Sequence, residues 1–232
     1  MALPYSKSKI TAIIPAKNEA QGLSKIIAEV EKYAGEIIVV DGHSTDNTKQ
    51  IVEKHKAIYL LDSGKGRGDG VRMAVKKASN ETIVLVDADG SHELSDIPCL
   101  VTPILHNKAD LVTSSRRTGG SSDMQMNFDG LLRSAGSDLL VMLTNNYFHS
   151  HLTDILYSFR AVKKSKFLKA KIISDGFSIE QEMVIAFLHK KYKIVEIPSR
   201  ESARGWGVSK LKTSAGIGLF LKLIFDLYIR EW

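Results

Sequence analysis

The sequence predicts an α/β fold with a Rossmann-like, mostly parallel sheet flanked by helices. In the first 115 residues, short apolar runs alternate with amphipathic stretches, as expected of repeated β-α units. Each of the first five apolar runs is followed by charged, polar or glycine-rich residues. Because ligands of parallel sheets bind beyond the carboxyl ends of the strands, these residues are predicted to build one site at that edge. A chain of 232 residues that is 44% hydrophobic suits one large domain, or one domain with an appendage.

The apolar runs are short and rich in leucine or β-branched residues, which is typical of buried strands. The five runs in the first half of the chain cover residues 10–14, 37–40, 58–61, 83–86 and 111–113. Two later strands are expected around residues 157–162 and at residues 193–197.

Helical patterns fill the spaces between the strands. Apolar residues share one face within residues 23–30, and the capping residues 44–46 open a helix that runs to His55. Later helices are expected at residues 128–145, 179–189 and 215–229. The Gly-, Ser-, Asp- and Asn-rich residues 119–127 are expected to form a mobile loop over the site.

The last helical pattern is apolar nearly all round and is interrupted only by Lys222 and Asp226. It is shorter than the roughly 20 residues that a bilayer-spanning helix needs. Three alternatives are open for it: packing on the core of the domain, lying in a membrane interface, or packing on a partner chain.

The basic excess of the chain lies in its last third. Residues 1–159 contain 17 Lys and Arg against 19 Asp and Glu, whereas residues 160–232 contain 15 against 7. Such a region contacts anionic lipid, a phosphorylated substrate or nucleic acid, or it is simply a solvated surface. Cys99 is the only cysteine, which excludes an internal disulfide, and the first residues lack the apolar stretch of a secretory signal. A cytoplasmic location is therefore expected.

Two carboxylates, Asp87 and Asp89, follow the fourth strand with one residue between them. Two acidic groups this close cannot both remain ionised at low cost without a cation. Mg²⁺ and Mn²⁺ prefer oxygen ligands and keep water and substrate phosphates in their coordination shell. The pair is therefore predicted to hold Mg²⁺ or Mn²⁺ against a diphosphate. Taken alone, the pair also fits a strand-end turn with two solvated aspartates.

The third strand is followed by a glycine-rich segment, residues 64–70, which includes Lys65 and Arg67. Glycines let backbone N–H groups approach phosphate oxygens, and the two basic residues add positive charge. The segment is not a P-loop, because Gly66 stands where a P-loop has Ser or Thr. A dinucleotide-binding fingerprint follows the first strand of its sheet rather than the third, which disfavours a nicotinamide-dependent dehydrogenase.

Eight segments, in this order, resemble glycosyltransferase family 2, and within it the dolichol-phosphate mannosyltransferase-like branch. They are IIPAKNEA, VVDGHSTDNT, the Gly-Lys-Gly loop, VDADGSHE, SSRR, TDILYSFRA, IEQEM and EIPSRESARGWGVSKL, and they span residues 10 to about 212. The resemblance implies a GT-A fold for residues 1–212, with residues 213–232 as a C-terminal apolar helix that packs on the domain or lies at a membrane interface. It also implies a metal-dependent enzyme that transfers a hexose with inversion from a nucleoside-diphosphate sugar.

The resemblance further implies roles for individual residues. The nucleotide-binding residues would be Pro15, Ala16, Asn18, Glu19, Asp41, Lys65 and Asp87. The metal ligands would be Asp87 and Asp89. A basic cradle for an acceptor phosphate or the leaving diphosphate would comprise Arg116, Arg133, Arg204 and Lys210. The expected catalytic residues are Asp89, Glu180, Arg204 and Lys210, with Glu180 as the general base for a hydroxyl acceptor.

Three positions depart from the family pattern. Gly42 stands where a second aspartate is usual, Ser91 where the polyprenyl-phosphate branch often has glutamine, and Ser158 where a glycine is usual. The first bears on recognition of the base, the second on a third metal contact, and the third on a local backbone turn.

The leading hypothesis is transfer from GDP-mannose or a UDP-hexose to a polyprenyl phosphate at the cytoplasmic membrane face. The chain would contact the membrane peripherally through its basic, apolar C-terminal region, or through a membrane partner. The alternatives are a soluble or glycan hydroxyl acceptor with the same donor, and a non-catalytic nucleotide-binding module. Nucleic acid is not an expected partner, and a homo-oligomer is left open.

Overall fold

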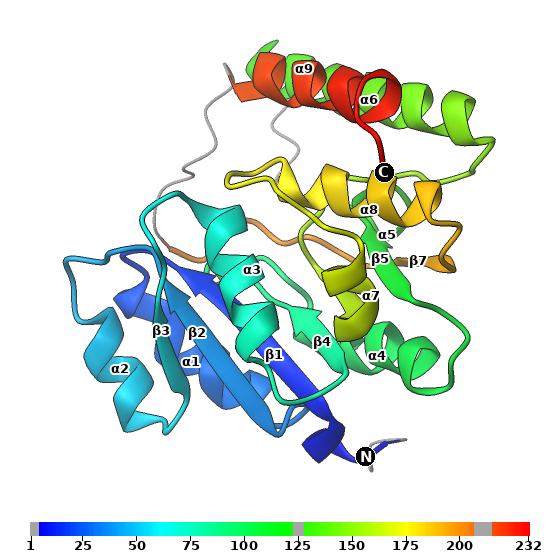
Figure 1. The fold of residues 1–232 in the computed structure, drawn as a ribbon. Helices are drawn as coiled ribbons and strands as arrows, with labels where there is room; N and C mark the ends of the chain where they lie inside the picture. Colours follow the sequence, from blue (N-terminus) through cyan, green and yellow to red (C-terminus); the bar gives the residue numbers. More distant parts are fainter. Residues whose placement is uncertain (1–4, 123–127, 207–214) are drawn as a thin grey trace.

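The computed structural model describes residues 5–122, 128–206 and 215–232, which form a seven-stranded sheet with helices on both faces (Figure 1). The strands are β1 (Ile10–Ala16), β2 (Glu36–Asp41), β3 (Ile58–Leu61), β4 (Thr82–Leu85), β5 (Leu111–Ser115), β6 (Arg160–Lys163) and β7 (Ile194–Pro198). The α-helices are α1 (Ala20–Val30), α2 (Thr48–Lys54), α3 (Arg67–Lys77), α4 (Ile97–Leu105), α5 (Arg116–Gly119), α6 (Phe128–Phe148), α7 (Lys164–Lys169), α8 (Ile179–His189) and α9 (Ala215–Tyr228). Two short 3-10 helices are η1 (Lys7–Lys9) and η2 (Leu94–Asp96).

The strand order in the sheet is β3-β2-β1-β4-β6-β5-β7. β6 runs antiparallel to its neighbours β4 and β5, and the other pairings of the described strands are parallel. The predicted mostly parallel α/β sheet is therefore confirmed, and each strand overlaps the apolar run that predicted it. The direction of β6 was not predicted.

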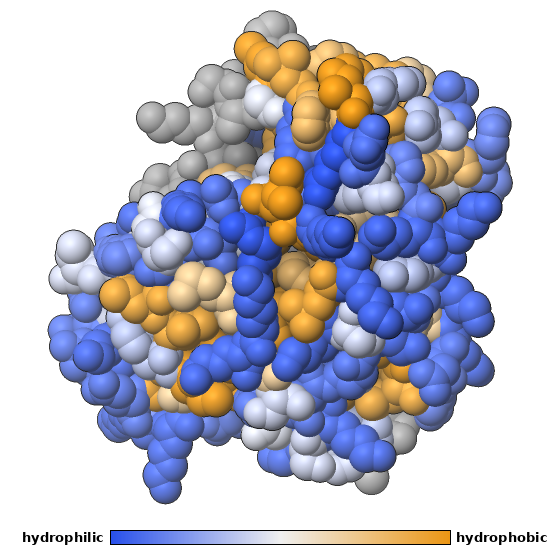
Figure 2. Space-filling model, viewed as in Figure 1, coloured by the Kyte–Doolittle hydropathy of each residue, from blue (hydrophilic) through white to orange (hydrophobic). Residues whose placement is uncertain are grey.

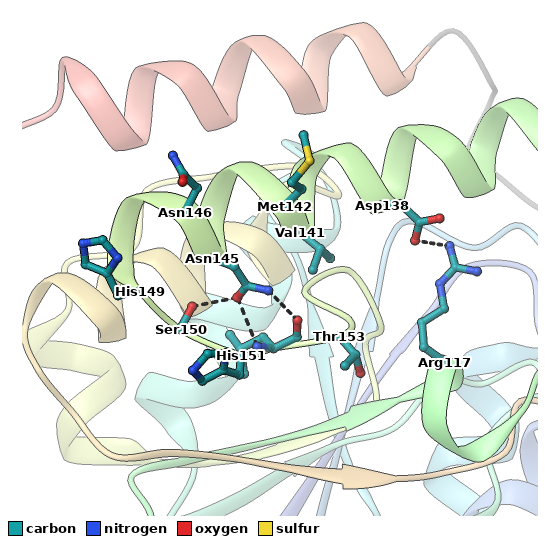
Figure 3. Close-up of a pocket in the computed structure, with 11 residues that line it drawn as sticks. Arg117, Asp138, Val141, Met142, Asn145, Asn146, His149, Ser150, His151 and Thr153 are labelled. Carbon is teal, nitrogen blue, oxygen red and sulfur yellow. Dashed lines mark hydrogen bonds and ion pairs between the residues drawn. The ribbon is translucent and has the colours of Figure 1, made fainter.

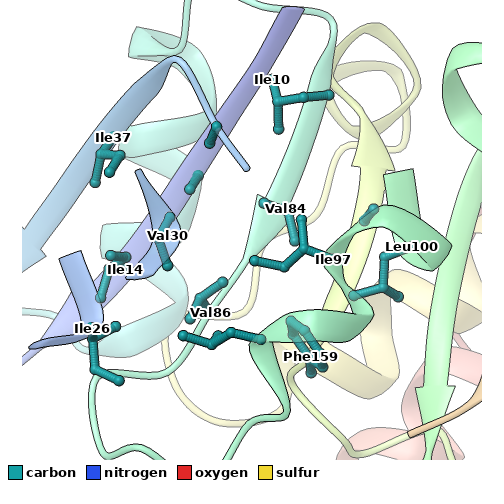
Figure 4. Close-up of a cluster of buried hydrophobic side chains, with 14 of the residues drawn as sticks. Ile10, Ile14, Ile26, Val30, Ile37, Val84, Val86, Ile97, Leu100 and Phe159 are labelled. Atoms are coloured by element: carbon teal, nitrogen blue, oxygen red, sulfur yellow. The ribbon is translucent and has the colours of Figure 1, made fainter. Parts of the chain in front are cut away.

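The central strands are buried on both faces, so their side chains alternate between two cores. In β1, Ile14 belongs to the core beneath α1 and α4, whereas its neighbour Ile13 belongs to the opposite core with α3 and α8. Figure 4 shows the first of these cores, to which Val84 of β4, Val30 of α1 and Ile97 of α4 all belong. Full burial of one large aliphatic side chain contributes about 1.5–3 kcal/mol, so these two cores fix the strands whose ends carry the polar segments.

A third layer, made of α6 and α9, packs on the outer side of α8 (Figure 1). Leu223 and Leu227 of α9 are buried in the same core as α8. The fully buried Glu182 of α8 forms ion pairs with Arg230 and, at 3.8 Å, with Lys222, whose Nζ lies 2.5 Å from buried Asp226. One face of α9 is thus held on the domain by both apolar and ionic contacts.

The opposite face of α9 is apolar and exposed. Ile217, Leu221 and Ile229 are 71%, 63% and 66% exposed, and Met142 of α6 is also exposed. Figure 2 shows apolar surface over this layer. In the described ranges, no helix combines the length and apolarity that a membrane-crossing segment requires. Six of the exposed apolar side chains of this layer are called the apolar face below: Met142, Ile217, Leu221, Phe225, Tyr228 and Ile229.

Candidate active site

The carboxyl edge of the sheet gathers the polar segments that the sequence placed after each strand. Because β6 is antiparallel, the residues that precede β6, rather than those that follow it, lie at this edge. Ser158 comes two residues before β6, and its hydroxyl donates a hydrogen bond of 2.6 Å to Oδ2 of Asp87, just beyond β4. The serine that replaces the usual family glycine therefore contacts the first aspartate of the Asp-x-Asp pair.

Asp87 is joined to Glu180 through Arg67. Nη2 of Arg67 lies 2.6 Å from Oδ1 of Asp87, and its Nε lies 2.9 Å from Oε1 of Glu180. Burial alone would raise the pKa of Asp87, but the adjacent guanidinium holds it well below its ordinary value. Asp87 is thus ionised at neutral pH and has Arg67 as its counter-charge.

Asp89 has a second arginine of its own. Nη2 of Arg204 lies 2.9 Å from Oδ2 of Asp89, and Nη1 lies 3.7 Å from Oε1 of Glu19. The other oxygen of Asp89 accepts hydrogen bonds from the backbone N–H (3.0 Å) and hydroxyl (2.7 Å) of Ser91. The two arginine-bridged pairs, Asp87–Arg67–Glu180 and Asp89–Arg204–Glu19, are called the double clamp below.

His92 contacts Asp87 of the double clamp, and it also contacts Ser158. Its Nδ1 accepts a hydrogen bond of 3.2 Å from the backbone N–H of Asp87, so Nε2 carries the proton and faces the Ser158 hydroxyl at 3.2 Å. The ring stacks on Phe159 with centroids 4.6 Å apart. Burial lowers the pKa of His92 against the attraction of Asp87, so the imidazole is neutral and orients Asp87 without adding charge.

Asn18 and Asp41 join the ends of the first three strands. Asn18 has a left-handed backbone (φ 56°), and its Oδ1 accepts a hydrogen bond of 2.8 Å from the backbone N–H of Thr45. Buried Asp41 accepts hydrogen bonds from the Ser44 backbone N–H (2.9 Å) and the Tyr59 hydroxyl (2.7 Å). Pro15 and Ala16 end β1 beside them. The predicted nucleoside-binding residues therefore form one continuous wall, although the polar groups of Asn18 and Asp41 already have partners in it.

Arg116, one residue of the predicted phosphate cradle, is held by two carboxylates and an aromatic ring. Nε of Arg116 lies 2.6 Å from Asp154, its Nη1 lies 3.6 Å from Glu201, and the guanidinium stacks over the Tyr157 ring at 4.9 Å. A phosphate contact by Arg116 would require one of these carboxylates to give way. Arg133 is exposed on α6.

Lys65 and Lys210 complete the set of predicted basic residues. Lys65 is exposed in the loop before α3, and in the described parts of the chain the ion pairs with the Asp-x-Asp pair come from Arg67 and Arg204 instead. Lys210 lies outside the described residues, as do residues 123–127 of the predicted mobile loop.

Residues 201–206 run along the Asp-x-Asp loop. The backbone N–H of Gly205 donates to the Asp89 carbonyl (2.9 Å), and the Trp206 Nε1–H donates to the Ala88 carbonyl (3.1 Å). The indole fills space left by two glycines: a Cβ at Gly90 would lie 2.8 Å from the ring, and a Cβ at Gly22 of α1 would overlap it. Trp206 therefore anchors the segment that presents Arg204 to Asp89.

We expect Gly22→Ala to lower sugar transfer by about ten- to a hundredfold, because the new methyl group displaces Trp206 and shifts Arg204 away from Asp89. In a Trp206→Ala background the clash is gone, and the same change should stabilise the protein by roughly 1 kcal/mol, since alanine forms helix better than glycine. Transfer rates and melting temperatures of the four variants check this double-mutant cycle. If Gly22→Ala lowers the transfer rate equally in both backgrounds, the Gly22–Trp206 contact does not position Arg204.

A pH dependence follows from the Asp154–Arg116 pair. Burial alone would raise the pKa of Asp154, but Arg116 and two backbone N–H groups keep it below its ordinary value of 3.8. A depressed carboxyl pKa adds stability that is present above the unfolded-state pKa and is lost as the pH falls through the folded-state pKa. We therefore expect the melting temperature to fall on acidification below about pH 4. The fall should be less steep in Asp154→Asn, whose melting temperature is already below that of the wild type at pH 7. Asp138→Asn, at an exposed pair with Arg117, should parallel the wild type.

A separate groove of about 780 Å³ lies between α6 and residues 149–153 (Figure 3). Arg117 points along its edge to Asp138 at 2.5 Å, and Asn145 binds Ser150 and the backbone of Leu152 (Figure 3). None of the predicted site residues that the structure describes lines this groove. The groove is therefore distinct from the double clamp.

Four residues of the site were not assigned to it from the sequence: Arg67, His92, Ser158 and Trp206. In the sequence, Arg67 is only a positive charge next to Lys65, and Ser158 is only a departure from the family's glycine. The sequence does indicate a role for Trp206, because a large ring in the C-terminal segment needs space that glycines elsewhere in the chain, such as Gly22 and Gly90, leave open. His92 lies three residues after Asp89, within the VDADGSHE segment.

Strand-end aspartates, a glycine-rich loop after the third strand and an arginine of the C-terminal segment thus meet at one edge of a mostly parallel sheet, as expected of a family 2 glycosyltransferase. The chain belongs to glycosyl transferase family 2, whose family model matches residues 11–167. Glycosyltransferase AglJ of Haloferax volcanii is 29% identical over 193 residues, which cover 82% of this chain and 62% of that protein, so the chain spans less than two thirds of this relative. An uncharacterised protein of Methanocaldococcus jannaschii, MJ0544, is 30% identical over 196 residues, covering 80% of this chain and 84% of the relative.

The fold is also shared with solved structures. Glucosyl-3-phosphoglycerate synthase from Mycobacterium tuberculosis, in complex with Mn²⁺, UDP-glucose and phosphoglyceric acid, matches with a TM-score of 0.76 at 17% identity, covering 97% of this chain and 81% of that chain. A structure of the same enzyme with Mg²⁺ and UDP matches with a TM-score of 0.75. The GT-A fold expected from the sequence is thereby confirmed.

Proposed function

We propose that this glycosyltransferase is metal-dependent and inverting, and that it moves a hexose from GDP-mannose or a UDP-hexose to a polyprenyl phosphate, as in the dolichol-phosphate mannosyltransferase-like branch. The double clamp is the observation that carries the proposal. Its four carboxylates and two guanidiniums leave a formal charge of −2, and the neutral His92 does not change it. One divalent cation would neutralise this charge at the edge where ligands of such sheets bind.

The donor atoms fit Mg²⁺ or Mn²⁺. Asp87 and Asp89 offer hard carboxylate oxygens, and these cations need only one or two carboxylates when water and phosphate oxygens complete the shell. This matters because no group of three or more His, Cys, Asp or Glu side chains gathers at one point in residues 5–122, 128–206 and 215–232. When bound, the cation would neutralise the leaving diphosphate. The solved relative binds UDP-glucose together with Mn²⁺, which supports the same pairing here.

The remaining predicted residues have definite tasks in this proposal. The wall of Pro15, Ala16, Asn18 and Asp41 would hold the nucleoside, with Glu19 beside it through Arg204. Arg204 would turn from Asp89 to the diphosphate once the cation is bound, because guanidinium groups pair well with phosphate oxygens. Arg116, Arg133 and Lys210 remain proposed contacts of the acceptor phosphate.

The position of Glu180 favours a phosphate acceptor over a hydroxyl. A hydroxyl acceptor needs a general base, for which Glu180 is the candidate, but its Oε1 already accepts a hydrogen bond from Arg67. A phosphate oxygen is anionic at neutral pH and needs no proton removed before it attacks the anomeric carbon. The arrangement of Arg67 and Glu180 therefore supports the polyprenyl-phosphate proposal.

The apolar face supports a location at a membrane. A lipid-borne acceptor has to be met at the bilayer surface, and α9 together with the residue that follows it presents exposed Ile217, Leu221 and Ile229. Such a face can lie in the membrane interface without a helix that crosses the bilayer. We propose that the C-terminal segment, residues 213–232, docks there on the cytoplasmic side.

The donor and the cation can be tested together by a thermal-shift screen. A nucleotide sugar that binds the folded state raises the melting temperature. We expect GDP-mannose or a UDP-hexose to raise it only when Mn²⁺ or Mg²⁺ is present. If neither donor changes the melting temperature under any cation condition, the proposed donor class is wrong.

The acceptor requires a separate assay. Purified enzyme with its donor and Mn²⁺ should transfer sugar to a short-chain polyprenyl phosphate and not to the matching polyprenol or to soluble glycans. Transfer to soluble hydroxyls but not to the polyprenyl phosphate would establish the alternative acceptor class.

A further inference from the structure

The double clamp contains one arginine whose part in the reaction is unassigned. We propose that Arg67 is a positioning residue that holds Asp87 as an ion pair until the metal–nucleotide complex displaces it, so that cation and nucleotide bind as one cooperative unit. The inference rests on the proposed function, because it presupposes a cation at the Asp-x-Asp pair.

Arg67 is fixed at its base. It is the first residue of α3 and follows Gly66, whose φ of 127° favours glycine. A Cβ at Gly66 would lie 2.8 Å from the Asp175 carbonyl, and the backbone N–H of Gly68 donates 2.7 Å to the same carbonyl. The residues around Asp175 lead directly into α8, which carries Glu180. The start of α3 and the start of α8 are therefore held together, and the Arg67–Glu180 pair is built into the loop geometry.

The guanidinium is engaged on one side only. Nε and Nη2 bind Glu180 and Asp87, whereas Nη1 has no hydrogen-bond partner within the described parts of the chain. Its side chain is largely buried, so the pair with Asp87 is shielded from water. Arg67 can therefore keep its bond to Glu180 and offer Nη1 and Nη2 to a diphosphate oxygen when Asp87 is taken by a cation.

This geometry has a thermodynamic consequence. A divalent cation that arrives alone at Asp87 has to displace a guanidinium that then keeps only Glu180 as a partner, so the cation binds weakly. A diphosphate that arrives with the cation gives the displaced guanidinium new oxygen partners. The two therefore strengthen each other's binding, and by thermodynamic linkage the factor is the same in both directions.

Trp206 offers a local reporter for both ligands. Its indole donates to the Ala88 carbonyl between the two aspartates, whereas the other tryptophan of the chain, Trp232, bonds to the Asp226 carbonyl. In a Trp232→Phe background, quenching of Trp206 fluorescence by paramagnetic Mn²⁺ gives the cation affinity without any measurement of activity. Titrations use Mn²⁺ alone, Mn²⁺ with UDP, and Mn²⁺ with GDP.

We expect Arg67→Gln to tighten the binding of Mn²⁺ alone by about tenfold, while the cooperativity between Mn²⁺ and the preferred nucleotide falls by about tenfold. The matched control is Arg72→Gln, because Arg72 lies on the same helix and pairs with Asp69 and Asp175 rather than with a carboxylate of the double clamp. The control should leave both quantities near the wild-type values.

Tighter binding of Mn²⁺ alone together with lower cooperativity separates this role from a purely structural one, which would weaken both. Weaker binding of both Mn²⁺ and nucleotide in folded Arg67→Gln, or unchanged cooperativity, would overturn the inference. Arg67→Lys keeps the charge but cannot bridge both carboxylates in the same way. It should still bind Mn²⁺ alone weakly, and tight binding would likewise contradict the proposal. If wild-type protein shows no Mn²⁺-dependent nucleotide binding at all, the proposed function itself fails.

Discussion

Asp89→Asn is expected to lower metal-dependent sugar transfer by about a thousandfold. The change keeps the shape of the side chain but removes the negative charge that would face the cation and that now faces Arg204 at 2.9 Å. Stabilisation of a leaving diphosphate by a metal is worth several kcal/mol, and each 1.36 kcal/mol is a factor of ten in rate. Steady-state transfer assays over a range of Mn²⁺ concentrations give the size of the loss.

Two comparisons make this result specific. Asp138→Asn removes a carboxylate from the exposed Arg117 pair and should leave transfer unchanged. Nucleotide binding by Asp89→Asn, measured by thermal shift, should no longer respond to Mn²⁺. A variant that keeps both its transfer rate and its Mn²⁺ response would show that Asp89 is not a metal ligand.

Gly68→Ala is expected to have the largest effect on stability. A Cβ at this position would lie 2.9 Å from the Asp175 carbonyl carbon and from the Gly176 carbonyl oxygen, and backbone atoms cannot rotate away. Overpacking of this kind costs about 3 kcal/mol at the upper end of its range, whereas alanine recovers about 1 kcal/mol as a better helix former. The net loss of about 2 kcal/mol should lower the melting temperature by roughly 4–8 °C.

Gly136→Ala is the matched control for this prediction. Gly136 lies in α6, and a Cβ there meets nothing within 4 Å. Only the helix propensity remains, so this variant should gain about 1 kcal/mol and melt roughly 2–4 °C higher. If both variants shift in the same direction, close packing of α3 on the residues around Asp175 does not set the stability.

The fold was predictable because its signals are local. Each strand is a short run such as Ile10 to Ile14, and the end of each run is marked by Asn18, Asp41 or Asp87. The rule that parallel strands end at one edge then gathers these residues without further information. The direction of β6 was not predictable in this way, because it depends on pairing with β4 and β5, which are distant in the sequence.

The arrangement within the site was less predictable for the same reason. Lys65 and Arg67 look equivalent in a glycine-rich segment, but only Arg67 begins α3 and is thereby aimed at Asp87. The phosphate contact of Arg116 stays a prediction from its motif, but its ion-pair partner Asp154 comes 38 residues later and could not be inferred from that motif. Side-chain direction and long-range pairing, rather than residue type, decided both cases.

The packing of Trp206 on Gly22 has an evolutionary consequence. Positions 22 and 206 belong to distant segments, yet one large ring occupies the space of an absent side chain on α1. Homologues that retain an aromatic residue at position 206 should therefore retain glycine at position 22. Lineages that lose the aromatic ring are free to accumulate larger residues on that turn of the helix, so the two positions should covary.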